Sequence, residues 1–260
     1  MSDSSAPLLE SRDARGVVTL TMNRPATFNA LGEEMLDALQ AAFDRLADDA
    51  GLRAVVLAGA GKAFCPGHNL KEMLARPELA YYQQLFARCS RVMLAIQKLP
   101  VPVIARVHGI ATAAGCQLVA QCDLAVASTD AKFAVSGINV GLFCSSPSVP
   151  LARNMHPKQA MEMLVTGDFI SAEQARERGL VNRAVAPDQL DAEVESLLAS
   201  IVAKPREALA IGKDLFYRQR ELGVEAAYQL AGQTMAVNMV AHCAQEGVSA
   251  FAEKRKPSWS

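Results

Sequence analysis

Two glycine-rich segments combine residue types that could stabilise a negatively charged oxygen. The first covers residues 59–73 (GAGKAFCPGHNLKEM), where a predicted strand leads into a loop and then into a helix that begins near Asn69. Gly67 allows the backbone to turn tightly. The unpaired N–H groups at a helix start then face whatever lies beyond the end of the strand. The segment therefore predicts one N–H donor for an anion.

The second segment covers residues 107–118 (VHGIATAAGCQL), where a predicted strand ends at Val107 and a helix begins near Ala113. The run of small residues from 111 to 115 allows close approach of a ligand or of another backbone. Two N–H groups aimed at one point form an oxyanion hole, in which one donor contributes about 3–4 kcal/mol to a transition state. Spacing alone leaves open whether the loops converge or are only turns and packing.

Other functional motifs are excluded because residues that they require are missing. The GAGK sequence at 59–62 is not a phosphate loop, because Val56 stands where a glycine is needed and Ala63 where Ser or Thr is needed. No dinucleotide-binding glycine pattern opens a helix, and Ser136 lacks the flanking glycine of a nucleophile elbow. Cys65 and His68 have half a zinc spacing without a second half, so we expect no metal site.

Composition narrows the class of protein. The 260 residues carry a net charge of −1, with 51% hydrophobic and 20% charged residues. This balance fits a folded chain with a large core, of one large domain or two small ones. It excludes extensive disorder. It also argues against nucleic acid or a membrane surface as the main partner, since both require a basic face. The six cysteines are expected to be free and mostly buried.

The chain shows no targeting or membrane-spanning pattern. Residues 1–16 lack the apolar run of a secretory signal, and their three acidic residues are unsuited to a mitochondrial transit peptide. The longest apolar stretch, residues 101–127, is interrupted by charged and amide side chains. We therefore expect a cytoplasmic protein.

Hydrophobic periodicity predicts the elements that position the two loops. Four strands are expected at residues 17–22, 54–58, 102–107 and 123–127, and two helices at 32–47 and 81–98. This alternation predicts α/β layering. The last third is helical, over residues 171–178, 187–202, 206–219, 224–240 and 245–254. We divide the chain into an αβ core at 1–203 and a helical region at 204–260.

Four motifs in this order resemble the enoyl-CoA hydratase/isomerase (crotonase) superfamily. They are MNRPATFNAL (22–31), GAGKAFCPGHNLKEM (59–73), PVIARVHGIATAAGCQLVAQCD (102–123) and EGVSAFAEKRKPSW (246–259). The resemblance extends over essentially the whole chain. It implies an α/β fold, a crotonase-like spiral of ββα turns followed by a helical trimerisation region. It also implies a homotrimer or a dimer of trimers.

The resemblance further implies an acyl-CoA substrate, with coenzyme A entering as part of that substrate and no other cofactor. The oxyanion donors fall on the N–H groups of His68 and Ala114. The CoA-binding positions fall on Lys62, Ala63, Phe64, Pro66, Gly67 and His68, with Lys71 near the phosphates. Phe251 and Lys254 fall where the C-terminal helix approaches the adenine end.

This sequence departs from the family at its two catalytic glutamates, which fall on Gln117 and Gly137. An amide can orient a water but cannot take its proton, and glycine has no side chain. Because general acid–base catalysis contributes about 10²–10⁴-fold per group, most ordinary hydratase activity should be lost. His68 is the candidate replacement. The remaining pocket candidates are Asn139, Cys144 and Ser145, together with Ser146, which with Pro147 also fits a helix start.

Three functions remain open from the sequence. The first is an enoyl-CoA hydratase, a lyase that acts through a backbone oxyanion hole. The second is a decarboxylase of a malonyl-type CoA, because loss of CO₂ forms the enolate without a base. The third is a non-catalytic CoA-ester binder. Phe86, Met93 and Leu94 share one helix face, which we interpret as core rather than acyl pocket.

Overall fold

The computed structural model describes residues 5–259 of the chain. Its main sheet has six strands in the order β1-β2-β3-β4-β6-β9, parallel except for the antiparallel pair β1 and β2. The strands are β1 (Leu8–Arg12), β2 (Val17–Met22), β3 (Ala54–Gly59), β4 (Val103–Val107), β6 (Leu124–Ser128) and β9 (Arg183–Val185). All four predicted strands are present to within one residue at each end, and the two edge strands β1 and β9 were not predicted.

A second, smaller sheet makes the chain a spiral. Its strands, in the order β5-β7-β8, are β5 (Ile110–Thr112), β7 (Lys132–Ala134) and β8 (Ile170–Ser171). After β4 and again after β6, the chain passes from the main sheet to a short strand of the second sheet and then to a helix. The predicted crotonase-like ββα architecture is therefore confirmed. The two or three residues of each short strand are too few for a readable period of two, which is why the sequence pattern did not reveal them.

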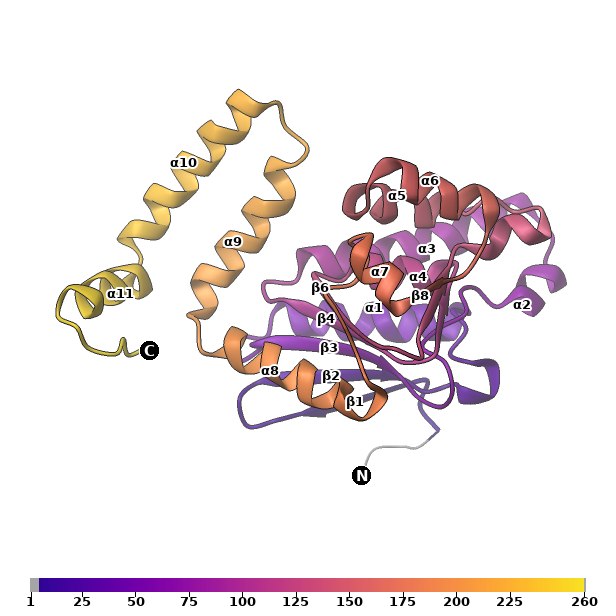
Figure 1. Cartoon of the computed structure of the whole chain (residues 1–260), viewed down its shortest axis with the longest axis horizontal. Coiled ribbons are helices and arrows are strands. Elements are labelled where there is room, and N and C mark those ends of the chain that lie inside the picture. Colours follow the sequence, from indigo (N-terminus) through magenta and orange to yellow (C-terminus); the bar gives the residue numbers. More distant parts are fainter. Residues whose placement is uncertain (1–4, 260) are drawn as a thin grey trace.

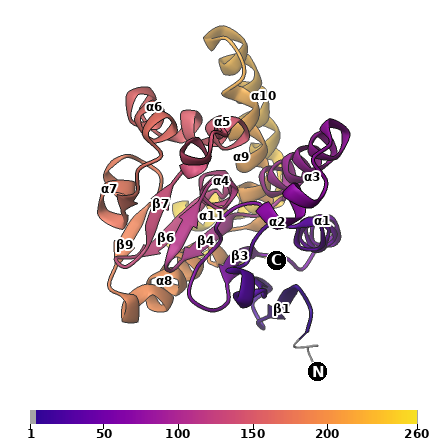
Figure 2. The same cartoon turned by 90° about the vertical axis from the view of Figure 1, so that its right-hand side faces the viewer.

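Helices cover both faces of the main sheet, as Figure 2 shows. The larger hydrophobic core lies between one face of the main sheet and the helices that pack on that face. Helix α8 (Leu190–Val202) covers the other face with Leu190, Val194 and Leu198. These side chains belong to one cluster with apolar residues of the sheet that include Val56 of β3, Ile104 of β4 and Val126 of β6. Because both faces are covered, β3 is buried along its whole length and is apolar throughout.

The other helices follow the predicted segments closely. They are α1 (Glu33–Ala47), α2 (Leu70–Ala75), α3 (Leu79–Lys98), α4 (Ala114–Gln121), α5 (Ser145–Asn154), α6 (Pro157–Thr166), α7 (Ala172–Glu177), α9 (Arg206–Gln219), α10 (Val224–Val240) and α11 (His242–Ala252). Helix α6 was not predicted. The start of α5 also differs from the prediction, because the helix begins at Ser145 with Cys144 as its N-cap, whereas Ser146 was the expected cap.

The three C-terminal helices stand away from the sheet (Figure 1). Only Lys213 and Ala250 are buried on α9 to α11. Lys213 anchors α9, because its ammonium group lies 2.6 Å from Asp123 and donates to the carbonyl groups of Ile96 and Val101. The division at residues 203 and 204, and the role of this region in trimerisation, stay predictions.

The structure also bears on the N-terminal and membrane predictions. Residues 1–4 of the segment analysed for targeting signals lie outside the described residues. Over residues 5–259, no helix is both long and apolar enough to cross a membrane.

Candidate active site

The two glycine-rich loops lie side by side. Strands β3 and β4 are parallel neighbours, so their carboxyl ends emerge at the same edge of the sheet. Beyond that edge the loops are hydrogen-bonded to each other: Cys65 N–H donates to Ile110 O (3.1 Å), and Thr112 N–H donates to Cys65 O (3.0 Å). The convergence that spacing left open is therefore present.

Glycines allow the loops to approach this closely. A Cβ atom at Gly115 would lie 2.0 Å from the Cys65 carbonyl oxygen. Gly67 has a φ of +101°, and a Cβ atom there would lie 3.1 Å from the backbone nitrogen of Ala114. The contact places the N–H of Ala114 beside Gly67, the residue that immediately precedes His68.

Both predicted N–H donors lack a backbone partner. Among residues 5–259, neither His68 nor Ala114 donates a backbone hydrogen bond to another backbone group. Ala114 is the first residue of α4, where N–H groups have no partner within the helix. The preceding Ala113 has a φ of +49°, a conformation that costs a side-chain-bearing residue about 1–3 kcal/mol.

Asn29 positions the first loop, a role that the sequence pattern did not reveal. Its side-chain amide donates to the carbonyl oxygens of Ala60 (2.9 Å), Ala63 (2.9 Å) and Phe64 (3.2 Å). Asn29 is fully buried and has a φ of +66°, which asparagine tolerates better than most residues. The MNRPATFNAL motif contained the signal, but only as part of a resemblance.

The His68 side chain packs beneath the loop. Its Nδ1 lies 3.1 Å from the Leu31 carbonyl oxygen, and its ring contacts the Phe86 ring edge-on at 5.4 Å. A hydrogen bond to a carbonyl oxygen requires a proton on Nδ1, which leaves Nε2 as the acceptor. Burial lowers the pKa of the His68 imidazole below its usual value, so the ring is neutral at pH 7.

The two positions to which the resemblance assigns the family's glutamates, Gln117 and Gly137, differ in their surroundings. Gln117 is only 3% exposed, and its Oε1 atom has no hydrogen-bond partner within residues 5–259. Gly137 is closed off, because a Cβ atom there would lie 2.5 Å from the Leu142 carbonyl oxygen and 2.8 Å from Cys144 Sγ. The first position therefore offers a buried acceptor, whereas the second has no room for a side chain.

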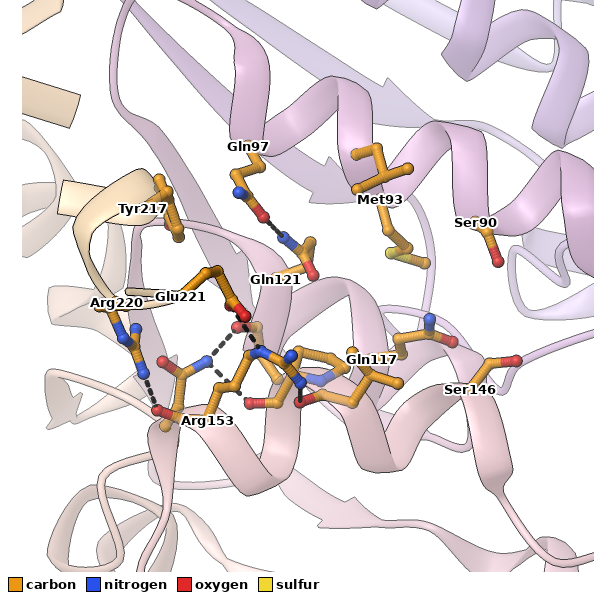
Figure 3. A pocket seen from close by; sticks show the side chains of 15 residues that line it. Ser90, Met93, Gln97, Gln117, Gln121, Ser146, Arg153, Tyr217, Arg220 and Glu221 are labelled. Atoms are coloured by element: carbon orange, nitrogen blue, oxygen red, sulfur yellow. Dashed lines mark hydrogen bonds and ion pairs between the residues drawn. The ribbon is translucent and has the colours of Figure 1, made fainter. Parts of the chain in front are cut away.

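A cavity of about 430 Å³ lies between α3, α4, α5 and α9 (Figure 3). Its lining residues are Ser90, Met93, Leu94, Gln97, Gln117, Ala120, Gln121, Ser146, Val149, Pro150, Arg153, Asn154, Tyr217, Arg220 and Glu221. Met93 belongs to the hydrophobic core, as predicted, and also lines this cavity. Leu94 is 49% exposed and lines the cavity as well, so its interpretation as a core residue was wrong.

The predicted pocket residues lie elsewhere. Asn139 donates to the Gly167 carbonyl oxygen at 3.3 Å, and Cys144 is buried against Gly137. Ser145 donates to the Phe143 carbonyl oxygen. None of the three lines the cavity, whereas the neighbouring Ser146 does.

The predicted CoA-binding residues other than Gly67 and His68 fall into three groups. Lys62 and Lys71 are exposed on the first loop and on α2, and Pro66 is half-buried between them. Ala63 and Phe64 are buried, and the Phe64 side chain belongs to the core, so it is not available for ligand contact. Phe251 and Lys254 lie at the opposite end of the molecule from α2 (Figure 1). Within a single chain, these two residues therefore do not reach the first glycine-rich loop.

The cysteines and potential metal ligands show no further site within the described residues. All six cysteines are free thiols, and five are buried. Burial raises the pKa of Cys65 and Cys116 to about 12, so both are protonated at neutral pH. In the same part of the chain, no group of three or more His, Cys, Asp or Glu side chains could hold a metal ion.

Comparison with known protein families identifies the class of protein to which this fold and its two adjacent loops belong. The enoyl-CoA hydratase/isomerase family model matches residues 12–260, and the chain belongs to this family.

Two solved structures and one further relative are particularly similar. A crystal structure of an enoyl-CoA hydratase from Mycobacterium smegmatis is 67% identical, with a TM-score of 0.96 over 97% of this chain and 98% of that one. Human enoyl-CoA hydratase domain-containing protein 3 is 42% identical, with a TM-score of 0.94 over 97% and 100%. The mitochondrial protein of that name from Mus musculus is 42% identical over 100% of this chain and 86% of its own length.

Proposed function

We propose that the protein binds acyl-CoA thioesters and stabilises negative charge on the thioester oxygen with the N–H groups of His68 and Ala114. The observation that carries this proposal is that two adjacent loops hold the N–H groups of His68 and Ala114, neither of which has a backbone partner within residues 5–259. Each such donor contributes about 3–4 kcal/mol when charge develops on the bound oxygen. The reactions that profit are those that pass through a thioester enolate.

Hydration of a 2-enoyl-CoA is the first candidate reaction. Water oxygen adds to C3, and a proton is delivered to C2. The Oε1 atom of Gln117 is a buried acceptor that can hold the attacking water. Gln117 cannot take the proton, so another group must carry it. His68 is neutral and has its Nε2 atom available as an acceptor, which makes it the candidate carrier.

Decarboxylation of a malonyl-type CoA is the second candidate reaction, and the closed position at Gly137 favours it. The bond between the α-carbon and the carboxylate breaks, CO₂ leaves, and the electron pair forms the enolate that the two N–H groups stabilise. A proton from water then restores the α-carbon. No proton-abstracting base is required.

The CoA portion would lie along the first loop. Lys62 and Lys71 are exposed cations, and neither forms an ion pair with any residue between 5 and 259. Phe251 and Lys254 would reach the adenine end of a site in a second copy of the chain. This arrangement accords with the expected homotrimer or dimer of trimers. A cytoplasmic location stays a prediction, because the similar domain-containing protein 3 relatives are described as mitochondrial.

The test is a paired measurement on the purified protein. CoA and acetyl-CoA are titrated by calorimetry, and a panel of enoyl-CoA and malonyl-type CoA esters is then followed by mass spectrometry. Binding with hydration supports the first reaction, and binding with CO₂ release supports the second. Binding without turnover points to a non-catalytic CoA-ester binder, and absence of binding overturns the proposal.

Replacing Gln117 with glutamate tests the hydration reaction directly. Gln117→Glu places a carboxylate at a buried position that already holds a side chain of this size. The hydration rate should therefore rise by about 10²–10⁴-fold. Gly137→Glu is the matched control, because its side chain would collide with the Leu142 carbonyl group and should disrupt the site rather than activate it. An unchanged hydration rate in a folded Gln117→Glu variant would count against hydration.

A further inference from the structure

The cavity beside α4 is lined by Gln117, which lies one turn beyond Ala114 on the same helix, whereas Ala114 and His68 do not line it. Ala114, Gln117 and Gln121 are spaced three and four residues apart, so they share one face of α4. Phe86, Ser90, Met93 and Gln97 share one face of α3 with similar spacing. The His68 ring contacts Phe86 at one end of this face, and Gln121 donates to Gln97 at the other. The cavity therefore leads away from the thioester site.

Two features indicate that the cavity holds a ligand. The amide oxygen of Gln117 is buried at its near end without a partner among residues 5–259, which is costly unless a ligand or water satisfies it. Apolar side chains, including Met93, Val149 and Pro150, also line the cavity. This combination of polar and apolar walls suits the carbon chain of an acyl group.

The far end of the cavity is positively charged. Arg153 pairs with Glu221 at 3.3 Å. Arg220 contacts the Arg153 carbonyl oxygen and lies 5.3 Å from the Phe216 ring centre, but it forms no ion pair with any residue in the range 5–259. Figure 3 shows Arg220 and Tyr217 at the opposite end of the cavity from Gln117 and Ser146. Two guanidinium groups and one carboxylate leave one positive charge there.

We propose that the preferred acyl group carries a carboxylate at its far end, which Arg220 binds. This inference rests on the proposed function, because the thioester must lie at His68 and Ala114. The helical rise from Ala114 to Gln121 is about 10 Å. An extended chain advances about 1.2 Å per bond, so about eight bonds span the length of α4 from Ala114 to Gln121. The substrate class is therefore a medium-length ω-carboxyacyl-CoA.

The test compares octanoyl-CoA with the CoA monothioester of octanedioic acid, each titrated into the full-length protein at low salt. The ω-carboxy ester should bind about tenfold more tightly, as expected for a charged hydrogen bond. Arg220→Gln should remove this difference, and Glu221→Gln should enlarge it. Arg218→Gln is the control that should preserve it, because Arg218 lies outside the cavity and pairs with Asp214.

The outcomes separate this inference from the proposed function. Equal affinity for the two esters overturns the ω-carboxylate assignment and leaves acyl-CoA binding intact. Failure of both esters to bind overturns the proposed function. An Arg220→Gln variant that weakens both esters equally shows a structural role for Arg220 and also overturns the assignment.

Discussion

Asn29 shows how one side chain can set the geometry of a site that it does not enter. Its amide holds three carbonyl groups of the first loop, and its Oδ1 accepts the Arg24 N–H at 2.9 Å. The same buried amide therefore fixes both the loop and the turn that precedes α1.

Asn29→Ala should lower the free energy of unfolding by about 3 kcal/mol, because several buried groups lose their partners. It should also weaken acyl-CoA binding, since the loop that carries the His68 N–H loses its support. Urea unfolding and calorimetric titration measure the two effects. A variant as stable as the native chain would contradict this role.

Ala113 is the clearest strained residue in the site. Its φ of +49° is a conformation that glycine adopts without cost. Ala113→Gly should raise the free energy of unfolding by about 1 kcal/mol. The relief of backbone strain stabilises the folded state, and the larger conformational entropy of the unfolded chain with glycine offsets part of this gain. Ala42→Gly, in the interior of α1, should instead lower it by about 1 kcal/mol or more. Urea unfolding distinguishes the two, and a destabilised Ala113→Gly variant would show that the strain is absent.

At the scale of elements, α11 is held to the body by its C-terminal tail. Glu246 on α11 accepts hydrogen bonds from Arg255 and from the Ser258 N–H, and the Trp259 indole donates to the Ala203 carbonyl oxygen at 2.9 Å. The contact with Arg255 lowers the pKa of Glu246 to about 2. Because the folded pKa lies below the ordinary value, this stabilisation is present above about pH 4.5 and is lost as the pH falls toward 2.

Acidification should therefore release the tail before the core unfolds. Trp259 is the single tryptophan of the chain, so its fluorescence reports the tail directly. We expect a red shift of its emission between about pH 4.5 and 2. Glu246→Gln should show the shifted emission already at pH 7, whereas Glu34→Gln on the distant α1 should behave like the native chain. Emission that does not change over this range would contradict the assignment.

At the scale of the whole molecule, the C-terminal helices leave a large apolar surface uncovered. No residue of α10 is buried, and its Tyr228 and Val240 are 76% and 79% exposed. Exposed apolar surface of this kind marks an interaction site. It is consistent with the proposed assembly of several copies.

The native chain should therefore have three or six times the mass of one chain in solution. Tyr228→Glu places a charge in the uncovered surface and should shift the assembly toward smaller species. Light scattering coupled to size-exclusion chromatography measures the mass. Leu79→Glu, at an exposed position on α3, controls for a general effect of added charge. A native chain that elutes as a monomer would contradict the prediction.

The family, the central strands of the main sheet and the bounds of most helices could all be predicted from the amino-acid sequence. Strands such as β3 are continuous apolar runs, and helices such as α1 have a clear period, so local patterns suffice to locate them. The two loops were found by the same means, because their glycines and their positions after strands are local properties. That the family's glutamate positions fall on Gln117 and Gly137 is implied by the resemblance and stays a prediction.

The contacts that these residues make became known only from the three-dimensional structure. Gly67 and Ala114 are far apart in the sequence but lie in contact in the structure. Gly137 has no space for a side chain because the carbonyl group of Leu142 lies beside it. Lys213 looks like a surface residue of α9 but is buried against Asp123. The cavity combines four helices that are separate in the sequence. Such contacts depend on how elements pack, which periodicity within one element does not specify.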